Sequence, residues 1–205
     1  MNTPSLSRLI VRNQVDLFCG PSDGGKYSLE EACSKCGTGA KRLDPLTIPR
    51  DQIPRDDIAV TLRRECIIGD RLSRVLTSRR ISCLREVHDR ATGDSLPVKE
   101  LLPEATLPPF AAATNGYERS DSCPECGRDG YFDIPHVRLQ IVYEHLDSSF
   151  FRYDLLATFE HFGLSRLRHP FEDSVFAAPL YLVSGRLAAL LRGCKKVELE
   201  PVELR

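Results

Sequence analysis

The sequence predicts an α+β fold of mixed sheets with short helices, and three observations support this class. The chain has 205 residues, of which 41% are hydrophobic, so it can bury the core of one or two domains. Short apolar runs of the kind found in strands alternate with two stretches of helical spacing. Two C-x-x-C-G turns, far apart in the chain, have the spacing of metal ligands.

The first half predicts a strand, a short helix and a strand. Extended segments are expected at 58–62 and 66–68, and Asp70 is expected to cap a helix. Leu72, Val75 and Leu76 fall on one face of that helix, and a further strand is expected at 81–87. The proline-rich segments 44–57 and 102–122 are predicted to be loops.

The second half repeats this order. A strand at 180–183 leads to Ser184 as a helix N-cap, Gly193 marks the helix end, and a strand follows from Val197. Between the halves, the pattern at 136–143 predicts a strand. The stretch 150–162 fits a strand or a helix, and its β-branched and aromatic residues favour a strand at 155–159.

A shift of 115 residues aligns the two halves without a gap. Internal duplication explains this match if each half supplies one C-x-x-C-G turn and one βαβ-like unit, near 57–90 and 178–203. Coincidence among common core residues explains it equally well. The matched pairs are Arg71 with Arg186, Leu72 with Leu187, Leu76 with Leu191, Arg80 with Lys195, Leu84 with Leu199, and Val87 with Val202.

Charge and hydropathy exclude several classes of protein. The 28 basic and 29 acidic residues give a net charge of −1, with no long block of either sign. No apolar run approaches the roughly 18 residues of a membrane span, and the first residues lack the apolar core of a secretory signal. We therefore expect a cytoplasmic protein whose cysteines are thiols or metal ligands rather than disulfides.

Four of the eight cysteines form the two C-x-x-C-G pairs, Cys33 with Cys36 and Cys123 with Cys126. A two-residue gap lets both sulfurs of a turn face one ion, and two such turns complete a tetrahedron. The glycine that follows can adopt positive φ and close the turn. We predict one structural Zn²⁺ per chain, held by zinc-ribbon-like turns near 28–43 and 119–132.

The intervening residues, 37–122, are far more than the 15–20 of a compact zinc ribbon. Unrelated buried thiols therefore remain an alternative, whereas two matched turns argue against a redox site. A metal shared by distant turns predicts one composite domain over 1–205. The other four cysteines, Cys19, Cys66, Cys83 and Cys194, are expected to pack as small apolar side chains.

Motifs of catalysis are missing from the sequence. The glycine-rich run from Gly20 to Tyr27 approaches a phosphate-binding loop, but Tyr27 stands where Ser or Thr would bind Mg²⁺. The neighbouring pairs His145 with Asp147, and Glu160 with His161, are candidate acid–base pairs, but a solvated strand end explains each pair better. We therefore predict that the protein is not an enzyme.

An arginine-rich segment at 55–90 favours a second function, the binding of nucleic acid. Acidic residues interrupt the segment, and it lacks the aromatic side chains on which bases stack. Nucleic-acid binding is therefore the alternative rather than the first prediction. The arginines are Arg55, Arg63, Arg64, Arg71, Arg74, Arg79, Arg80, Arg85 and Arg90.

The two C-x-x-C-G turns, with the stretches 159–163, 170–171, 179–191 and 198–202, resemble the double-CXXCG motif proteins. That family is known mainly from myxobacteria and their relatives, and some members are regarded as immunity proteins that neutralise a toxin. The resemblance implies a metal-ligand role for Cys33, Cys36, Cys123 and Cys126. It also predicts a zinc-stabilised, non-enzymatic protein whose partner is another protein, such as a cognate toxin.

Overall fold

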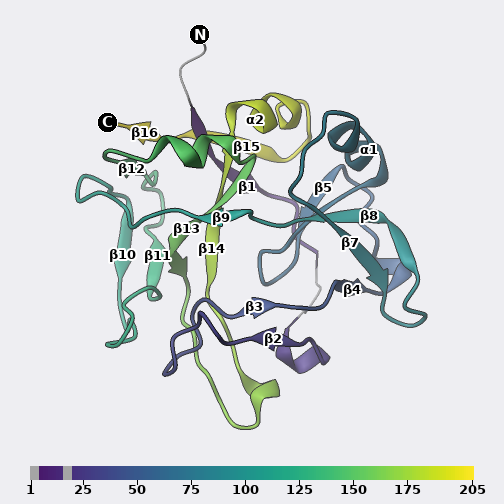
Figure 1. Ribbon diagram of the computed structural model, residues 1–205, viewed down its shortest axis with the longest axis horizontal. Coiled ribbons are helices and arrows are strands. Elements are labelled where there is room, and N and C mark those ends of the chain that lie inside the picture. Colours follow the sequence, from purple (N-terminus) through teal and green to yellow (C-terminus); the bar gives the residue numbers. More distant parts are fainter. Residues whose placement is uncertain (1–4, 16–19) are drawn as a thin grey trace.

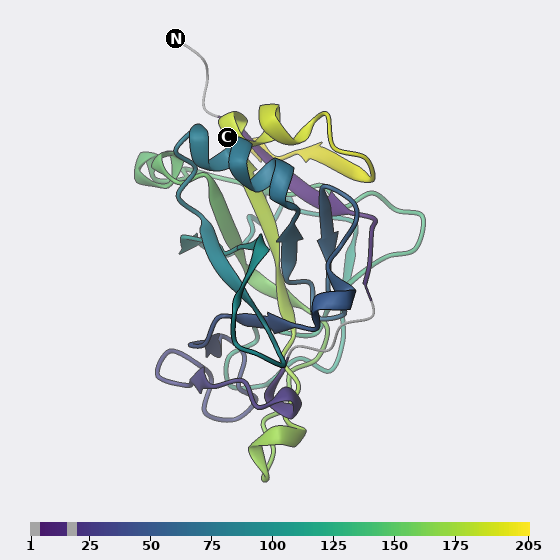
Figure 2. The same cartoon turned by 90° about the vertical axis from the view of Figure 1, so that its right-hand side faces the viewer.

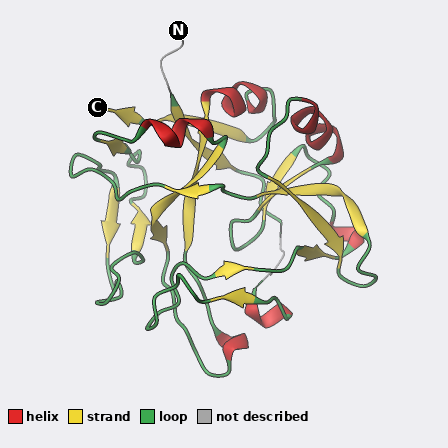
Figure 3. Ribbon diagram, viewed as in Figure 1, coloured by secondary structure: helices red, strands yellow, loops and turns green. Residues whose placement is uncertain are grey.

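Strands dominate the structure, and most of them belong to two five-stranded sheets (Figures 1 and 3). The computed structural model describes residues 5–15 and 20–205. Two α-helices lie within these ranges, α1 (Asp70–Ser78) and α2 (Gly185–Leu191). The expected combination of mixed sheets with short helices is thus confirmed.

The first sheet combines strands from both ends of the chain, in the order β15-β1-β14-β13-β9. Neighbouring strands run antiparallel, except β9 and β13, which run parallel. The expected strand at 155–159 is confirmed as the larger part of β13. The bounds are β1 (Leu6–Val11), β9 (Ala105–Thr106), β13 (Leu155–Phe162), β14 (Ala178–Ser184) and β15 (Val197–Pro201).

The second sheet is formed by residues 46–101 alone, in the order β4-β7-β8-β6-β5. Here β4 and β7 run parallel, and the other neighbours run antiparallel. The bounds are β4 (Leu46–Ile48), β5 (Ile58–Val60), β6 (Cys66–Ile68), β7 (Leu84–Asp89) and β8 (Ser95–Leu101).

The two helices lie at the same end of the molecule (Figures 1 and 2). Ser184 caps α2 as expected, because its hydroxyl accepts a hydrogen bond from the Leu187 N–H at 3.1 Å. The N-cap of α1 is Gly69 and not Asp70, which is the first residue of the helix, so the predicted cap was wrong by one residue. Val75 is 41% exposed, and the buried face of α1 lies on Leu72 and Leu76.

Each helix connects two parallel strands of its sheet that have an antiparallel strand between them. In the second sheet, β6-α1-β7 encloses β8, and in the first sheet β14-α2-β15 encloses β1. The segments 57–90 and 178–203 are therefore split βαβ units. The enclosed strand follows its unit in one case and lies far upstream in the other.

The same contact between an aspartate and an arginine recurs at both helix starts. Asp57 precedes β5, its carbonyl accepts from the Gly69 N–H, and its carboxylate accepts two bonds from Arg71. Asp154 precedes β13, and Ser184 and Arg186 contact it in the same way. Arg71 and Arg186 are the first pair aligned by the sequence shift.

A shared apolar core joins the two sheets beneath the helices. Leu72 and Leu76 of α1 belong to one cluster with Leu187 and Leu191 of α2, and all four are buried. The segment after β1 also reaches the second sheet, where the Val60 N–H donates to the Asn13 carbonyl at 2.8 Å. Further apolar clusters cover other faces of the two sheets.

Several expected loops contain regular structure. The segment 44–57 includes β4 and a 3-10 turn (Arg50–Gln52), and 102–122 includes β9 and the start of a hairpin. The strand expected at 136–143 is reduced to β12 (Val142–Tyr143). Neither helix among the described residues is long and apolar enough to span a bilayer.

Candidate metal centre

Each C-x-x-C-G turn lies between the two strands of a short hairpin. The first turn connects β2 (Tyr27–Ser28) with β3 (Lys41–Arg42). The second connects β10 (Tyr117–Arg119) with β11 (Tyr131–Asp133). The remaining two-stranded sheet pairs β12 with β16 (Glu203–Leu204) in parallel and contains neither cysteine turn.

The two turns have the same backbone geometry. The Gly37 N–H donates to the Cys33 carbonyl at 2.8 Å, and the Gly127 N–H donates to the Cys123 carbonyl at 2.9 Å. Both glycines have positive φ, 81° and 59°, which side chains make unfavourable at other residues. The role expected for these two glycines is confirmed.

The four sulfurs of Cys33, Cys36, Cys123 and Cys126 meet at one place. All four Sγ atoms lie within 4.8 Å of one another. The Sγ atoms of Cys33 and Cys123 are 3.8 Å apart, and those of Cys36 and Cys126 are 3.6 Å apart. Each of these contacts joins one turn to the other, across 90 residues of sequence.

These distances fit a tetrahedral ion. Four sulfurs at about 2.3 Å from a central Zn²⁺ lie about 3.8 Å from one another. A disulfide would require about 2.05 Å, and all four cysteines are free thiols. The arrangement could therefore hold a metal ion, and the donor set of four thiols suits Zn²⁺ or iron.

Burial and hydrogen bonds act in opposite directions on the thiols. Burial raises the pKa of Cys33, but the backbone N–H groups of Cys36 and Lys35 outweigh this, and the pKa falls to about 7. Burial raises the pKa of Cys36 to about 12, although the hydroxyl and N–H of Thr38 stabilise its thiolate. Burial also raises the pKa of Cys126. A bound cation would stabilise all of these thiolates.

A buried carboxylate fixes the second turn to the segment that follows β13. Asp129 is 1% exposed, and its carboxylate accepts from the N–H groups of Cys123 and Ser165, each at 2.9 Å. Arg119 adds a hydrogen bond to the Gly127 carbonyl. Nothing in the sequence around Asp129 pointed to this role, because Ser165 is 36 residues away.

The basic residues near the turns do not all face the sulfurs. The Lys35 ammonium lies 3.8 Å from the Glu125 carboxylate, which belongs to the other turn. The Arg128 guanidinium lies over the Phe159 ring, 4.6 Å from its centre. These two contacts hold the turns to each other and to β13.

The remaining described cysteines lie in the core, away from the turns. Cys66, Cys83 and Cys194 are buried members of the shared cluster. Burial raises the pKa of Cys66 and of Cys83 to about 12, so both are neutral. Their expected packing role is confirmed, whereas Cys19 lies outside the described residues.

In neither of the two candidate acid–base pairs do the two side chains bond to each other. Asp147 caps a 3-10 turn (Ser148–Arg152), and His145 is exposed. Glu160 and His161 are 3% and 6% exposed, so a solvated strand end is wrong for them. Neighbours on a strand point to opposite faces, which explains why Glu160 bonds the Phe110 N–H while His161 contacts the Phe159 carbonyl.

Comparison with known proteins adds no relative to this description. No family model matches the sequence, and no curated protein matches it significantly. The four converging cysteines are therefore the feature on which a functional interpretation depends.

Proposed function

We propose that the protein is a zinc-stabilised, non-enzymatic protein that binds another protein, and that it acts as an immunity protein against a toxin. The convergence of four thiols from two matched turns carries the metal part of this proposal. The resemblance of these turns to double-CXXCG motif proteins supports the partner. In this role the metal supplies rigidity, because four ligands remove the freedom of two hairpins whose strands are only two or three residues long.

The metal is tested first. The purified protein is expected to contain about one equivalent of zinc per chain by elemental analysis. Its absorbance should lack the visible bands of iron–sulfur centres. Iron in place of zinc, or no metal after purification without chelators, would contradict this part of the proposal.

The partner is tested by neutralisation. A toxin encoded by a neighbouring gene is expected to lose its effect on growth when this protein is co-expressed, and the two should elute as a 1:1 complex. A Cys33→Ser/Cys123→Ser variant should fail to protect, and Cys194→Ala should protect. Failure of every neighbouring gene product to bind would count against an immunity role.

Nucleic-acid binding through residues 55–90 is the second candidate. Four of the arginines form ion pairs with carboxylates: Arg71 with Asp57, Arg74 with Asp70, Arg85 with Glu100, and Arg90 with Asp23. Ion pairs of this kind reduce the charge available to phosphates, which supports the lower rank of this candidate. It requires affinity for DNA or RNA that falls steeply with salt, so absence of binding at low ionic strength would exclude it.

We also propose that the two halves arose by internal duplication. Three observations support this: a C-x-x-C-G hairpin in each half, a split βαβ unit in each half, and the repeated aspartate–arginine contact. In homologous sequences, both contacts should be retained together when the halves are aligned. Independent loss of one motif in most homologues would favour coincidence.

A further inference from the structure

A cavity of about 410 Å³ lies between the two sheets and the first cysteine hairpin. Its volume falls in the range of about 300–1,000 Å³ found for small-molecule sites. Segments of both halves line it, including β3, β8, β13 and β14. The cavity also borders the two cysteine loops, since Glu31, Gly39 and Arg128 form part of its wall.

The cavity has an apolar side and a charged side. Leu102, Pro103, Ala157, Phe176 and Pro179 form the apolar wall. Five basic and three acidic side chains line the rest, an excess of two positive charges in a chain whose net charge is −1. The charged residues are Lys41, Arg42, Arg63, Arg85, Arg128, Glu31, Glu65 and Glu100.

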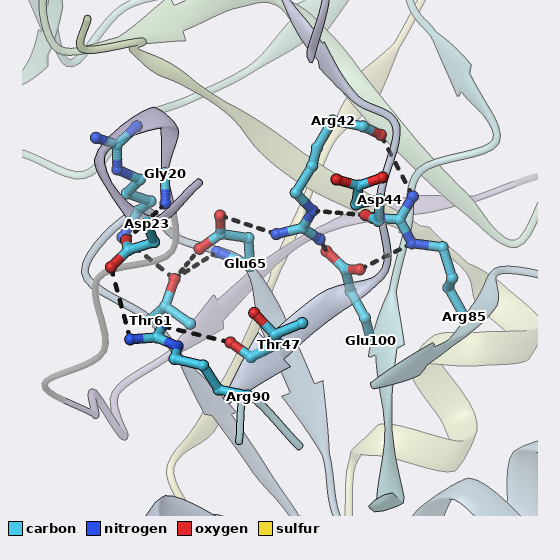
Figure 4. A network of polar contacts seen from close by, with 11 residues as sticks. Gly20, Asp23, Arg42, Asp44, Thr47, Thr61, Glu65, Arg85, Arg90 and Glu100 are labelled. Atoms are coloured by element: carbon cyan, nitrogen blue, oxygen red, sulfur yellow. Dashed lines mark hydrogen bonds and ion pairs between the residues drawn. The ribbon is translucent and has the colours of Figure 1, made fainter. Parts of the chain in front are cut away.

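The three acids are already neutralised by three of the basic residues, and Figure 4 shows Glu65 and Glu100, the two of these acids that contact Arg42. Arg42 contacts both Glu65 and Glu100, and Arg85 contacts Glu100 at 3.1 Å. Lys41 pairs with Glu31. The positive excess therefore resides on Arg63 and Arg128, which form no ion pair with any residue of 5–15 or 20–205.

Both uncompensated guanidinium groups are held in place. Arg63 packs against the backbone of Gly20, where a Cβ atom would lie 2.1 Å from its Cζ. Arg128 is fixed over the Phe159 ring, and its Nε donates to the Phe159 carbonyl at 3.4 Å. Positioned guanidinium groups lose less entropy on binding an anion and offer it two parallel hydrogen bonds.

We propose that this cavity is a binding site for a small organic anion, a carboxylate or phosphate on an apolar body, which Arg63 and Arg128 recognise. The apolar body packs against the wall around Phe176 and Pro179. The ion-paired residues Arg42, Glu65, Glu100 and Arg85 form the rigid side of the site. This site is separate from the protein-binding role proposed above and does not depend on it.

Aromatic probes that share one ring and differ in charge test the proposal on the metal-loaded protein. Phenyl phosphate and benzoate carry the proposed anions, whereas benzyl alcohol and benzylamine are the neutral and cationic controls. Calorimetric titration should show saturable binding of at least one anionic probe at millimolar concentration or below. The tighter of the two identifies phosphate or carboxylate as the preferred group. Inorganic phosphate alone should bind more weakly than phenyl phosphate.

Arg63→Gln and Arg128→Gln should each weaken binding of the preferred probe about tenfold or more. Arg55→Gln is the matched control, because Arg55 is exposed and does not line the cavity. Arg128 is next to the second cysteine turn, so metal content and melting temperature must be unchanged in each variant that is compared. Arg63 lies in neither cysteine turn and keeps the test decisive if Arg128→Gln loses metal.

The proposal is overturned if neither anionic probe binds, or if benzyl alcohol binds as well as benzoate and phenyl phosphate. It is also overturned if Arg63→Gln, with normal metal content, binds the preferred probe as tightly as the native protein does.

Discussion

Cys33 and Cys123 contact each other across the two turns, so each pair of ligands depends on the other turn. Changing both to Ser should reduce bound zinc from about one equivalent to nearly none, because a serine hydroxyl is a poor zinc ligand. Elemental analysis and melting temperature measure the result. Cys194→Ala removes a thiol that lies in the core, and this variant should keep its metal. Equal zinc in the double variant would contradict the site.

His161 makes stability depend on pH. Its ring is 6% exposed, and burial lowers its pKa from 6.5 to about 4. Between these values the unfolded chain binds a proton that the folded protein does not. The contribution of the neutral ring is therefore complete above about pH 6.5 and is lost as pH falls towards 4.

Urea unfolding at pH 7 and pH 4.5 tests this behaviour. The native protein should lose about 2–3 kcal/mol more free energy of unfolding over this range than His161→Gln does. Loss of metal at low pH affects both proteins and cancels in the comparison. His145→Asn, at an exposed position, should behave as the native protein. Identical pH dependence of His161→Gln and the native protein would show that His161 is not responsible.

A buried carboxylate helps to join strand β3 to the second sheet. Glu100 of β8 is 1% exposed and accepts hydrogen bonds from Arg42 of β3 and Arg85 of β7. Glu100→Gln keeps the shape but leaves two partly buried guanidinium groups without their shared charge. We expect a loss of about 3 kcal/mol in the free energy of unfolding.

Glu86→Gln is the control for this prediction. Glu86 lies on the neighbouring strand β7, is about half exposed and pairs with Lys99. Its loss should change stability by less than about 0.5 kcal/mol, as for other solvent-screened pairs. Chemical unfolding of both variants measures the difference. If Glu100→Gln lost no more free energy of unfolding than Glu86→Gln, the buried ion pairs would not stabilise the fold more than an exposed pair does.

Local patterns predicted the elements that are specified locally. Leu187 and Leu191 follow helical spacing behind the Ser184 cap, and α2 forms there. The strand β8 was missed because its sequence contains Pro97 and two charges, and burial between β6 and β7 stabilises it instead. The strand β4 was also missed because its stabilisation is not local: it pairs with β7, 41 residues further along the chain.

The cysteine site could be predicted from the sequence, whereas the cavity could not. A two-residue spacing followed by glycine is a local signal for both Cys33 and Cys123. Arg63 and Arg128 carry no comparable signal, because neither has a characteristic neighbour and only the packing of the halves brings them to one cavity. Asp129 was missed likewise, since its partner Ser165 is remote in sequence.

At the scale of the whole molecule, the metal and the apolar core stabilise different regions. Removing the metal with a chelator should increase amide hydrogen exchange in the hairpins β2–β3 and β10–β11. The strands β13 and β14 should stay protected, because their side chains lie in the apolar clusters. Hydrogen exchange read by mass spectrometry tests this, and restored zinc should reverse the change. Uniform loss of protection would show that the core also requires the metal.

The position of β1 also determines when the first sheet can form. Its hydrogen-bonding partners, β14 and β15, begin at residues 178 and 197. During translation β1 is made long before β14 and β15, so it has no partner strand in the first sheet until both have been made. The second sheet needs only residues 46–101, so it can fold first. An unpaired apolar strand that waits for distant partners is an aggregation hazard, and chaperone binding should increase the yield of folded protein.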